Sequence, residues 1–118
     1  MANEVEASVR GEGPLVAIDV AGEVTAFAED ALTRAYRAAI DRAAKYVLFD
    51  FRRATYINSA GISVLIGILT DSQQHDRRIL FTGLTPHYRK IFDLMGLSRY
   101  AGIFDTEDQA RQAIAERS

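Results

Sequence analysis

Short apolar runs rich in β-branched residues alternate with segments of helical periodicity along the whole chain, and this alternation most constrains the fold. Residues 15–20 (LVAIDV) follow a Gly-Pro turn, and apolar side chains alternate with polar ones over residues 5–9. This pattern predicts an opening hairpin. Residues 46–51 (YVLFDF) have the composition of a strand covered on both faces. A further strand is predicted at residues 78–82, and a short one near residues 103–104.

Four segments have the spacing or the capping residues of helices. After Thr25, a potential N-cap, apolar residues recur at helical spacing: Leu32, Ala35, Tyr36, Ala39, Ile40 and Ala43. A second helix is predicted over residues 61–76, with Ser59 just before it. Thr85-Pro86 opens a third helix that stops at Gly96, and Thr106 with Gln109 forms a capping box for the last one.

Strands that alternate with helices in a chain of 118 residues predict an α/β fold. We expect one domain over residues 1–118, with a mixed sheet of four or five strands and about four helices packed on it. The sequence contains no linker, internal repeat or low-complexity tract that would divide this unit.

Composition excludes several functional classes. The chain has no Cys and only two His, which lie on different predicted helices, so thiol catalysis and a metal site are not expected. Its net charge of -2 argues against a nucleic-acid partner. Residues 1–10 are polar and acidic, and the most hydrophobic window, residues 57–69, is too short to span a bilayer. We therefore expect a cytoplasmic protein with no direct membrane insertion.

The most informative segment is residues 56–65 (YINSAGISVL), because it places Ser59 at the start of a helix. The first turn of a helix offers unpaired N–H groups and the positive end of the dipole, which stabilise added negative charge. A phosphate on Ser59 would fit there without unfolding the helix. The alternative is that Ser59 is only an N-cap, and both interpretations can hold together.

The predicted second helix has two apolar sides. At 100° per residue, one side should face the sheet with Ile62, Leu65, Ile66 and Leu69. The opposite side carries Gly61, Val64, Ile68, Asp71 and His75, where a solvated helix would usually carry charge. Val64 and Ile68 could therefore belong to a partner surface, or the third helix could cover them.

At this segment the chain resembles the STAS domain family, in particular bacterial anti-sigma factor antagonists. Their signature resembles Asp-Ser-(Ser/Thr)-Gly-(Leu/Ile) before a Val-Leu-rich helix, and residues 58–62 (NSAGI) followed by Val64-Leu65 are similar to it. The resemblance extends from residues 22–24 (GEV) through Thr85-Pro86 to residues 91–97 (IFDLMGL).

This resemblance implies partner switching. The unmodified protein would bind a kinase-type anti-sigma factor, the kinase would phosphorylate Ser59, and a PP2C-type phosphatase would restore binding. The ATP and magnesium would belong to the kinase, so this chain would be neither an enzyme nor a cofactor-binding protein. Together with Ser59, the implied site comprises Asn58, Ala60, Gly61, Val64, Ile68, Thr25 and Glu23.

Two positions depart from the family pattern, which usually has Asp where this chain has Asn58 and often Asp where it has Thr25. Both changes remove a carboxylate near Ser59. A second interpretation of the same fold is therefore an unphosphorylated accessory subunit of a lipid-transport ATPase or of a stress-signalling assembly. A hydrolase is disfavoured, because residues 61–65 (GISVL) lack the second Gly of a nucleophile elbow.

Overall fold

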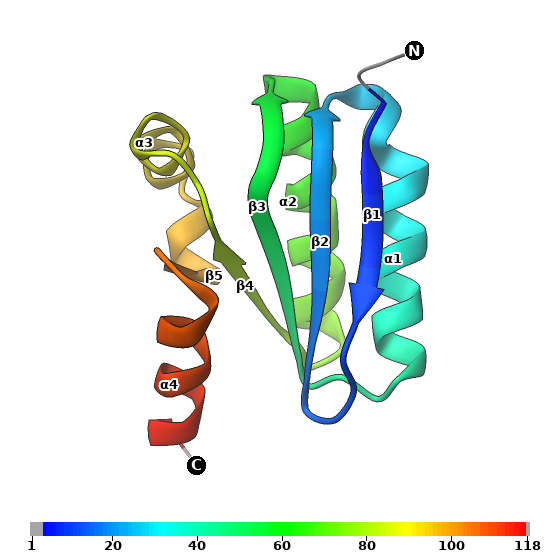
Figure 1. Cartoon of the computed structure of the whole chain (residues 1–118), viewed down its shortest axis with the longest axis vertical. Coiled ribbons are helices and arrows are strands. Elements are labelled where there is room, and N and C mark those ends of the chain that lie inside the picture. Colours follow the sequence, from blue (N-terminus) through cyan, green and yellow to red (C-terminus); the bar gives the residue numbers. More distant parts are fainter. Residues whose placement is uncertain (1–3, 118) are drawn as a thin grey trace.

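The computed structural model describes residues 4–117 and contains one mixed sheet (Figure 1). Its strands lie in sequence order: β1 (Glu6–Arg10), β2 (Leu15–Val24), β3 (Tyr46–Ile57), β4 (Arg78–Thr82) and β5 (Ala101–Phe104). β1 pairs with β2 in an antiparallel hairpin, whereas β2, β3, β4 and β5 run parallel to one another. The predicted α/β class, hairpin and mixed sheet are confirmed.

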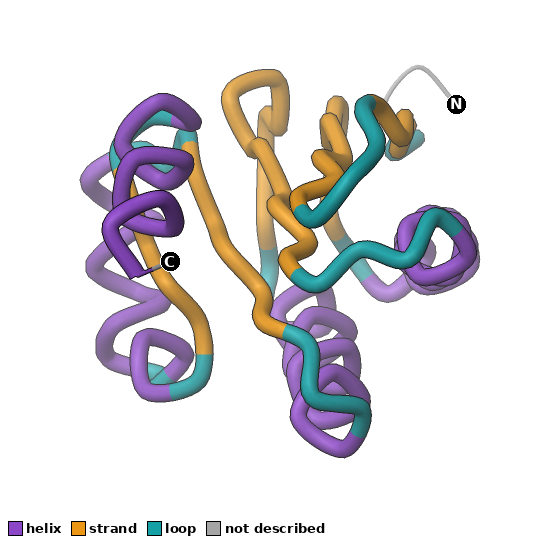
Figure 2. The backbone as a smooth tube through the Cα atoms, turned by 90° about the horizontal axis from the view of Figure 1, so that it is seen from below, coloured by secondary structure: helices purple, strands orange, loops and turns teal. Residues whose placement is uncertain are grey.

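The helices are divided unequally between the two faces of the sheet. They are α1 (Glu29–Asp41), α2 (Ser59–Gln74), α3 (Pro86–Leu94) and α4 (Glu107–Arg117), with two short 3-10 turns, η1 (Ala26–Ala28) and η2 (Leu97–Arg99). The main core joins α1, α2 and α3 to one face, whereas a smaller cluster around Ala110 joins α4 to the other. Figure 2 shows the strands in the middle with helices outside them.

The parallel strands are apolar because both of their faces are covered. In β3, Val47 and Phe49 enter the main core, whereas Leu48 between them enters the cluster under α4. Phe49, Phe51, Phe81 and Phe92 pack ring against ring at the centre of the main core.

Side-chain caps define most of the helix starts. Thr85 accepts a hydrogen bond from the Tyr88 amide, and Thr106 accepts one from the Gln109 amide, as predicted. Thr25 caps the 3-10 turn η1 rather than α1, which begins four residues later. The predicted helical position Ala43 lies beyond α1 in the left-handed region, with φ 60°.

Strand β3 is twice as long as predicted, and its second half extends beyond β4. Pairing with β4 ends at Asp50 opposite Thr82, but pairing with β2 continues to Val24 opposite Ile57. Two register irregularities between β2 and β3 accommodate the extra residues of β3. The ends of β2 and β3 therefore project together past β4 (Figure 1), and α2 begins at this projection.

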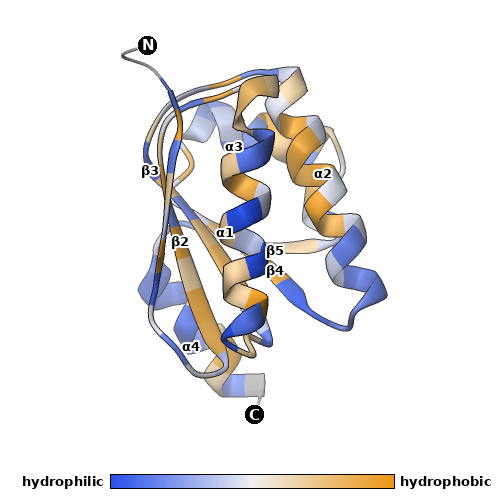
Figure 3. Ribbon diagram, turned by 90° about the vertical axis from the view of Figure 1, so that its right-hand side faces the viewer, coloured by the Kyte–Doolittle hydropathy of each residue, from blue (hydrophilic) through white to orange (hydrophobic). Residues whose placement is uncertain are grey.

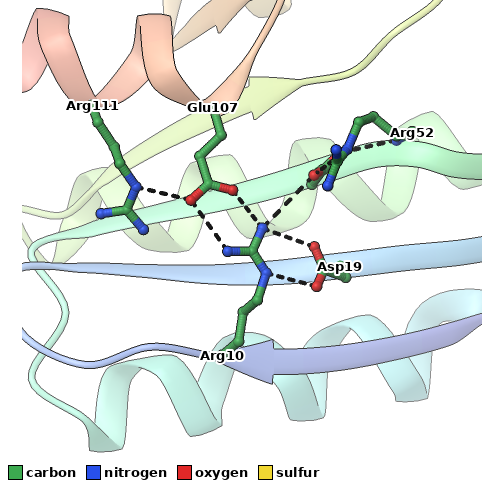
Figure 4. A network of polar contacts seen from close by, with 6 residues as sticks. Arg10, Asp19, Arg52, Glu107 and Arg111 are labelled. Carbon is green, nitrogen blue, oxygen red and sulfur yellow. Dashed lines mark hydrogen bonds and ion pairs between the residues drawn. The ribbon is translucent and has the colours of Figure 1, made fainter.

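A network of charged side chains ties α4 to the sheet (Figure 4). Arg10 of β1 donates to Asp19 of β2 and to Glu107 in the first turn of α4, and Arg111 also donates to Glu107. Asp50, which is buried, pairs with Arg52 over 2.9 Å. These contacts give Glu107 two cationic partners at the edge of the apolar cluster under α4.

Candidate functional site

Asn58, not Ser59, is the N-cap of α2. Its side-chain oxygen accepts a hydrogen bond from the Gly61 amide over 2.9 Å, and its own amide donates to the Val24 carbonyl over 3.1 Å. Ser59 is therefore the first residue of the helix rather than the residue before it. The interpretation of Ser59 as a simple N-cap is wrong, because the longer Asn side chain already occupies that role.

Gly61 allows the first turn of α2 to contact the end of β2. A Cβ atom on Gly61 would lie 2.1 Å from the Val24 carbonyl oxygen, closer than any real contact. The residue is buried and has an ordinary helical conformation, so close approach of the backbone explains the glycine. Gly61 fixes the position of the Ser59 turn and offers no side chain to a partner.

The hydroxyl of Ser59 is exposed and accepts or donates no hydrogen bond within residues 4–117. In the first turn of α2, the Gly61 amide donates its hydrogen bond to the Asn58 side chain. The amides of Ser59 and Ala60 remain as free hydrogen-bond donors. No acidic residue lies in this turn. The positive end of the helix dipole is therefore not neutralised beside the Ser59 hydroxyl.

The parallel pairing of β2 and β3 brings the remaining predicted site residues to the same edge. Glu23 lies opposite Tyr56 in the sheet, and Thr25 follows directly on the β2 residue that pairs with Ile57. Both Glu23 and Thr25 are half-buried. Glu23 and Thr25 at the end of β2 therefore lie at the same edge of the sheet as the Asn58–Ser59 turn that follows β3.

The exposed face of α2 differs from the predicted one. Ile62, Leu65 and Leu69 face the core as expected, but Ile66 is 38% exposed, so its predicted burial is wrong.

The opposite side of α2, predicted to face a partner or the third helix, packs towards α1. Ile68 is buried there, with 5% of its surface exposed, and Val64 is half-buried. The neighbour on this side is α1, not the third helix, as the shared cavity between α1 and α2 shows. The exposed side instead carries Ser59, Ser63, Ile66 and Thr70, and we call it the Ser59 face.

Two exposed aromatic residues beside this region were missed by sequence reasoning. Phe27 in η1 is 95% exposed, and η1 packs against α2. Tyr56, two residues before Asn58, is 46% exposed. Neither belongs to a periodic pattern, so the only signal in the sequence was their closeness to Thr25 and Asn58.

Other kinds of site are not formed by the described residues. Within residues 4–117, no group of three or more His, Asp or Glu side chains is placed to hold a metal ion. None of the helices in that range is both long and apolar enough to cross a membrane. The two histidines lie apart, with His75 at the end of α2 beside Asp71 and His87 in α3.

The sequence profile described as the STAS domain matches residues 6–110, which is most of the chain. The chain belongs to the STAS domain family. This STAS chain is 27% identical over 104 residues to BtrV of Bordetella bronchiseptica, a protein named as a candidate anti-sigma factor antagonist. The match covers 88% of this chain and 86% of BtrV.

Two solved structures share the fold of this STAS chain. An anti-sigma factor antagonist from Mycobacterium paratuberculosis is similar with a TM-score of 0.81 and 18% identity, over 98% of this chain and 97% of that one. The Bacillus cell fate determinant SpoIIAA, in its phosphorylated form, is similar with a TM-score of 0.69 and 21% identity. That match covers 92% of this chain and 98% of SpoIIAA.

Proposed function

We propose that this chain is an anti-sigma factor antagonist whose unphosphorylated form binds a kinase-type anti-sigma factor, and that phosphorylation of Ser59 releases this partner. One observation carries the proposal: Ser59 is an exposed first residue of α2, beside free amides and no carboxylate. The names of BtrV and of the structural neighbours support the same class of function.

The chain's part in this scheme is that of a protein substrate and binding partner in the cytoplasm. The kinase supplies ATP and magnesium, and a PP2C-type phosphatase removes the phosphate. A phosphate on Ser59 adds a charge of about -1.5 to -2 to the Ser59 face, which includes Ile66. A partner that packs on this face would then have to desolvate a dianion, which weakens the complex.

Asn58 is compatible with this role. An Asp at this position would accept the same hydrogen bond from the Gly61 amide, so the cap does not depend on the charge. Asn58 removes the repulsion that a carboxylate would exert on a neighbouring phosphate. The missing carboxylate therefore changes what a kinase recognises here more than it changes the helix start.

The test for modification uses purified kinase-type anti-sigma factors from the source organism, each incubated with this chain, ATP and magnesium. Mass spectrometry of peptides should find phosphate on Ser59 in the wild type and in Ser63→Ala, a matched control on the same face. Ser59→Ala should remain unmodified. Failure of every kinase to modify Ser59 would contradict the switch.

The test for binding uses calorimetry to measure the affinity of this chain and its variants for the same kinase-type anti-sigma factors. Ser59→Ala should bind like the unmodified chain, whereas Ser59→Asp should bind at least tenfold more weakly, the change expected for burying an unpaired charge. Equal binding of both variants argues against phosphorylation control. Co-purification with a transporter ATPase, without modification of Ser59, would instead favour the accessory-subunit role.

A further inference from the structure

A groove lies between α1 and α2, on the side of α2 adjacent to the Ser59 face. Its volume is about 520 Å³, within the range of small-molecule sites. Ile40 of α1 and Val64 and Ile68 of α2 provide apolar surface along it. Figure 3 shows that α2 is strongly hydrophobic over most of its length and ends in a hydrophilic turn.

Gly67 leaves the groove open on one side. It lines the cavity, and a Cβ atom added there would meet no other atom within 4 Å. A glycine in the interior of a helix costs about 1 kcal/mol relative to alanine, and here no close contact requires it. Gly67 is exposed, and its lack of a side chain leaves open space in the groove beside Val64 and Ile68.

The negative charge inside the groove is already engaged. Asp71 accepts a hydrogen bond from the Tyr36 hydroxyl over 2.7 Å, which links α2 to α1. His75 lies 3.6 Å from the other oxygen of Asp71. Burial and the Asp71 carboxylate raise the pKa of Tyr36, so its hydroxyl stays a proton donor to Asp71. The remaining acidic residue of the groove, Glu29, is at the first position of α1, about two turns before Arg37.

The positive charges of the groove, by contrast, have no anionic partner. Neither Arg37 nor Arg77 forms an ion pair with any residue between 4 and 117. The Nε atom of Arg77 is buried and has no acceptor within that range. The only side-chain hydrogen bond of Arg77 in that range is from Nη1 to the His75 carbonyl, over a long 3.4 Å. A half-buried guanidinium without a carboxylate is costly, and an anion would satisfy it.

We infer that the groove between α1 and α2 binds a small amphipathic carboxylate. Its hydrocarbon part packs on Ile40, Val64 and Ile68, and its carboxylate pairs with the guanidinium of Arg77. The groove extends along α2 from Val64 to His75, about 16 Å at 1.5 Å per residue, so a linear chain with one charged end fits its length. The inference is independent of the proposed function, because Ser59 lies on a different side of α2.

The test is an NMR titration of the ¹⁵N-labelled chain with octanoate, with 1-octanol and acetate as separate probes. Octanoate should shift the amides of α1 and α2 that line the groove. Octanol lacks the charge and acetate lacks the hydrocarbon, so each should bind at least tenfold more weakly. Arg77→Gln should weaken octanoate binding about tenfold through loss of the charge-assisted hydrogen bonds.

A second variant tests the cavity itself. Gly67→Leu should abolish the octanoate shifts, because leucine fills the open space, and it should fold because leucine is a better helix former than glycine. Thr70→Leu is the matched control: it adds the same side chain to the exposed side of α2 and should leave binding unchanged. Equal affinity for octanoate and octanol, or undiminished binding by Gly67→Leu, would overturn the inference.

Discussion

Asn58 connects the end of β2 to the start of α2 through two hydrogen bonds: its amide donates to the Val24 carbonyl, and its side chain accepts from the Gly61 amide. We expect Asn58→Ala to lower the free energy of unfolding by about 1 kcal/mol, because the Gly61 amide loses its acceptor. Asn58→Asp keeps the acceptor and adds a charge that the helix dipole favours, so it should be at least as stable as the wild type. Urea denaturation measures both, and a fully stable Asn58→Ala would show that the cap contributes nothing.

Two glycines of α2 form a natural pair for a second prediction. Gly61→Ala should cost about 3 kcal/mol, because its methyl group would overlap the Val24 carbonyl and force α2 away from β2. Gly67→Ala on the same helix should instead stabilise the chain by about 1 kcal/mol, because its methyl group meets only open space. Thermal unfolding of the two variants should shift in opposite directions, and shifts of the same sign would argue against the close approach at Gly61.

Among the elements, α4 is the helix whose attachment depends most on charge. Its partners Arg10 and Arg111 lower the pKa of Glu107 to about 2 from its ordinary value near 4.5. A carboxyl group whose pKa is lowered by folding stabilises the folded state at pH values above 4.5. That contribution is lost as the pH falls from 4.5 towards 2.

Glu107→Gln tests this attachment. Near neutral pH the variant should be less stable than the wild type by about 1 kcal/mol, a modest value because Arg10 and Glu107 are partly exposed. The difference should shrink below pH 4.5 and vanish near pH 2. Urea titrations at several pH values measure it, with Asp108→Asn, an exposed neighbour, as the control. A difference that does not change with pH would mean that the carboxylate charge is not what holds α4.

The sequence predicted the type and order of the elements well, because most of them carry local signals. The capping residues Thr85 and Thr106 mark real helix starts, and the apolar run from Tyr46 is a strand buried on both faces. Local signals alone, however, predicted that this strand ends at Phe51, whereas β3 continues to Ile57. Its second half includes Arg52 and Arg53 and is held by pairing with β2 rather than by its own composition.

The candidate site was predicted less completely, because its details depend on contacts between distant segments. Asn58 and Ser59 are both good N-cap residues, and the pairing of β3 with Val24 decides between them. The burial of Ile68 and the exposure of Ile66 depend on where α1 lies, which helical periodicity does not specify. The exposure of Phe27 likewise follows from the short η1 turn, which carries no periodic signal.

At the scale of the whole molecule, phosphorylation would about double a small net charge of -2. We expect the fold to tolerate this change, because Ser59 is exposed and its turn contains no carboxylate. The melting temperature of Ser59→Asp should stay within about 3 °C of the wild type. Circular dichroism measures it, and Ser63→Asp is the matched control in the same helix. A large loss of stability in Ser59→Asp alone would mean that modification acts by unfolding rather than at a surface.

The order of the strands has a consequence for how the chain is made. Because β1 to β5 lie side by side in sequence order, each strand pairs with the one synthesised just before it. Only the β1–β2 hairpin closes through a short turn, however, because each parallel pairing spans an intervening helix and forms more slowly. The Ser59 turn needs only β2, β3 and their neighbours, so it can assemble while later residues are still in the ribosome. The face beneath α4 is completed only after α4 has left the exit tunnel.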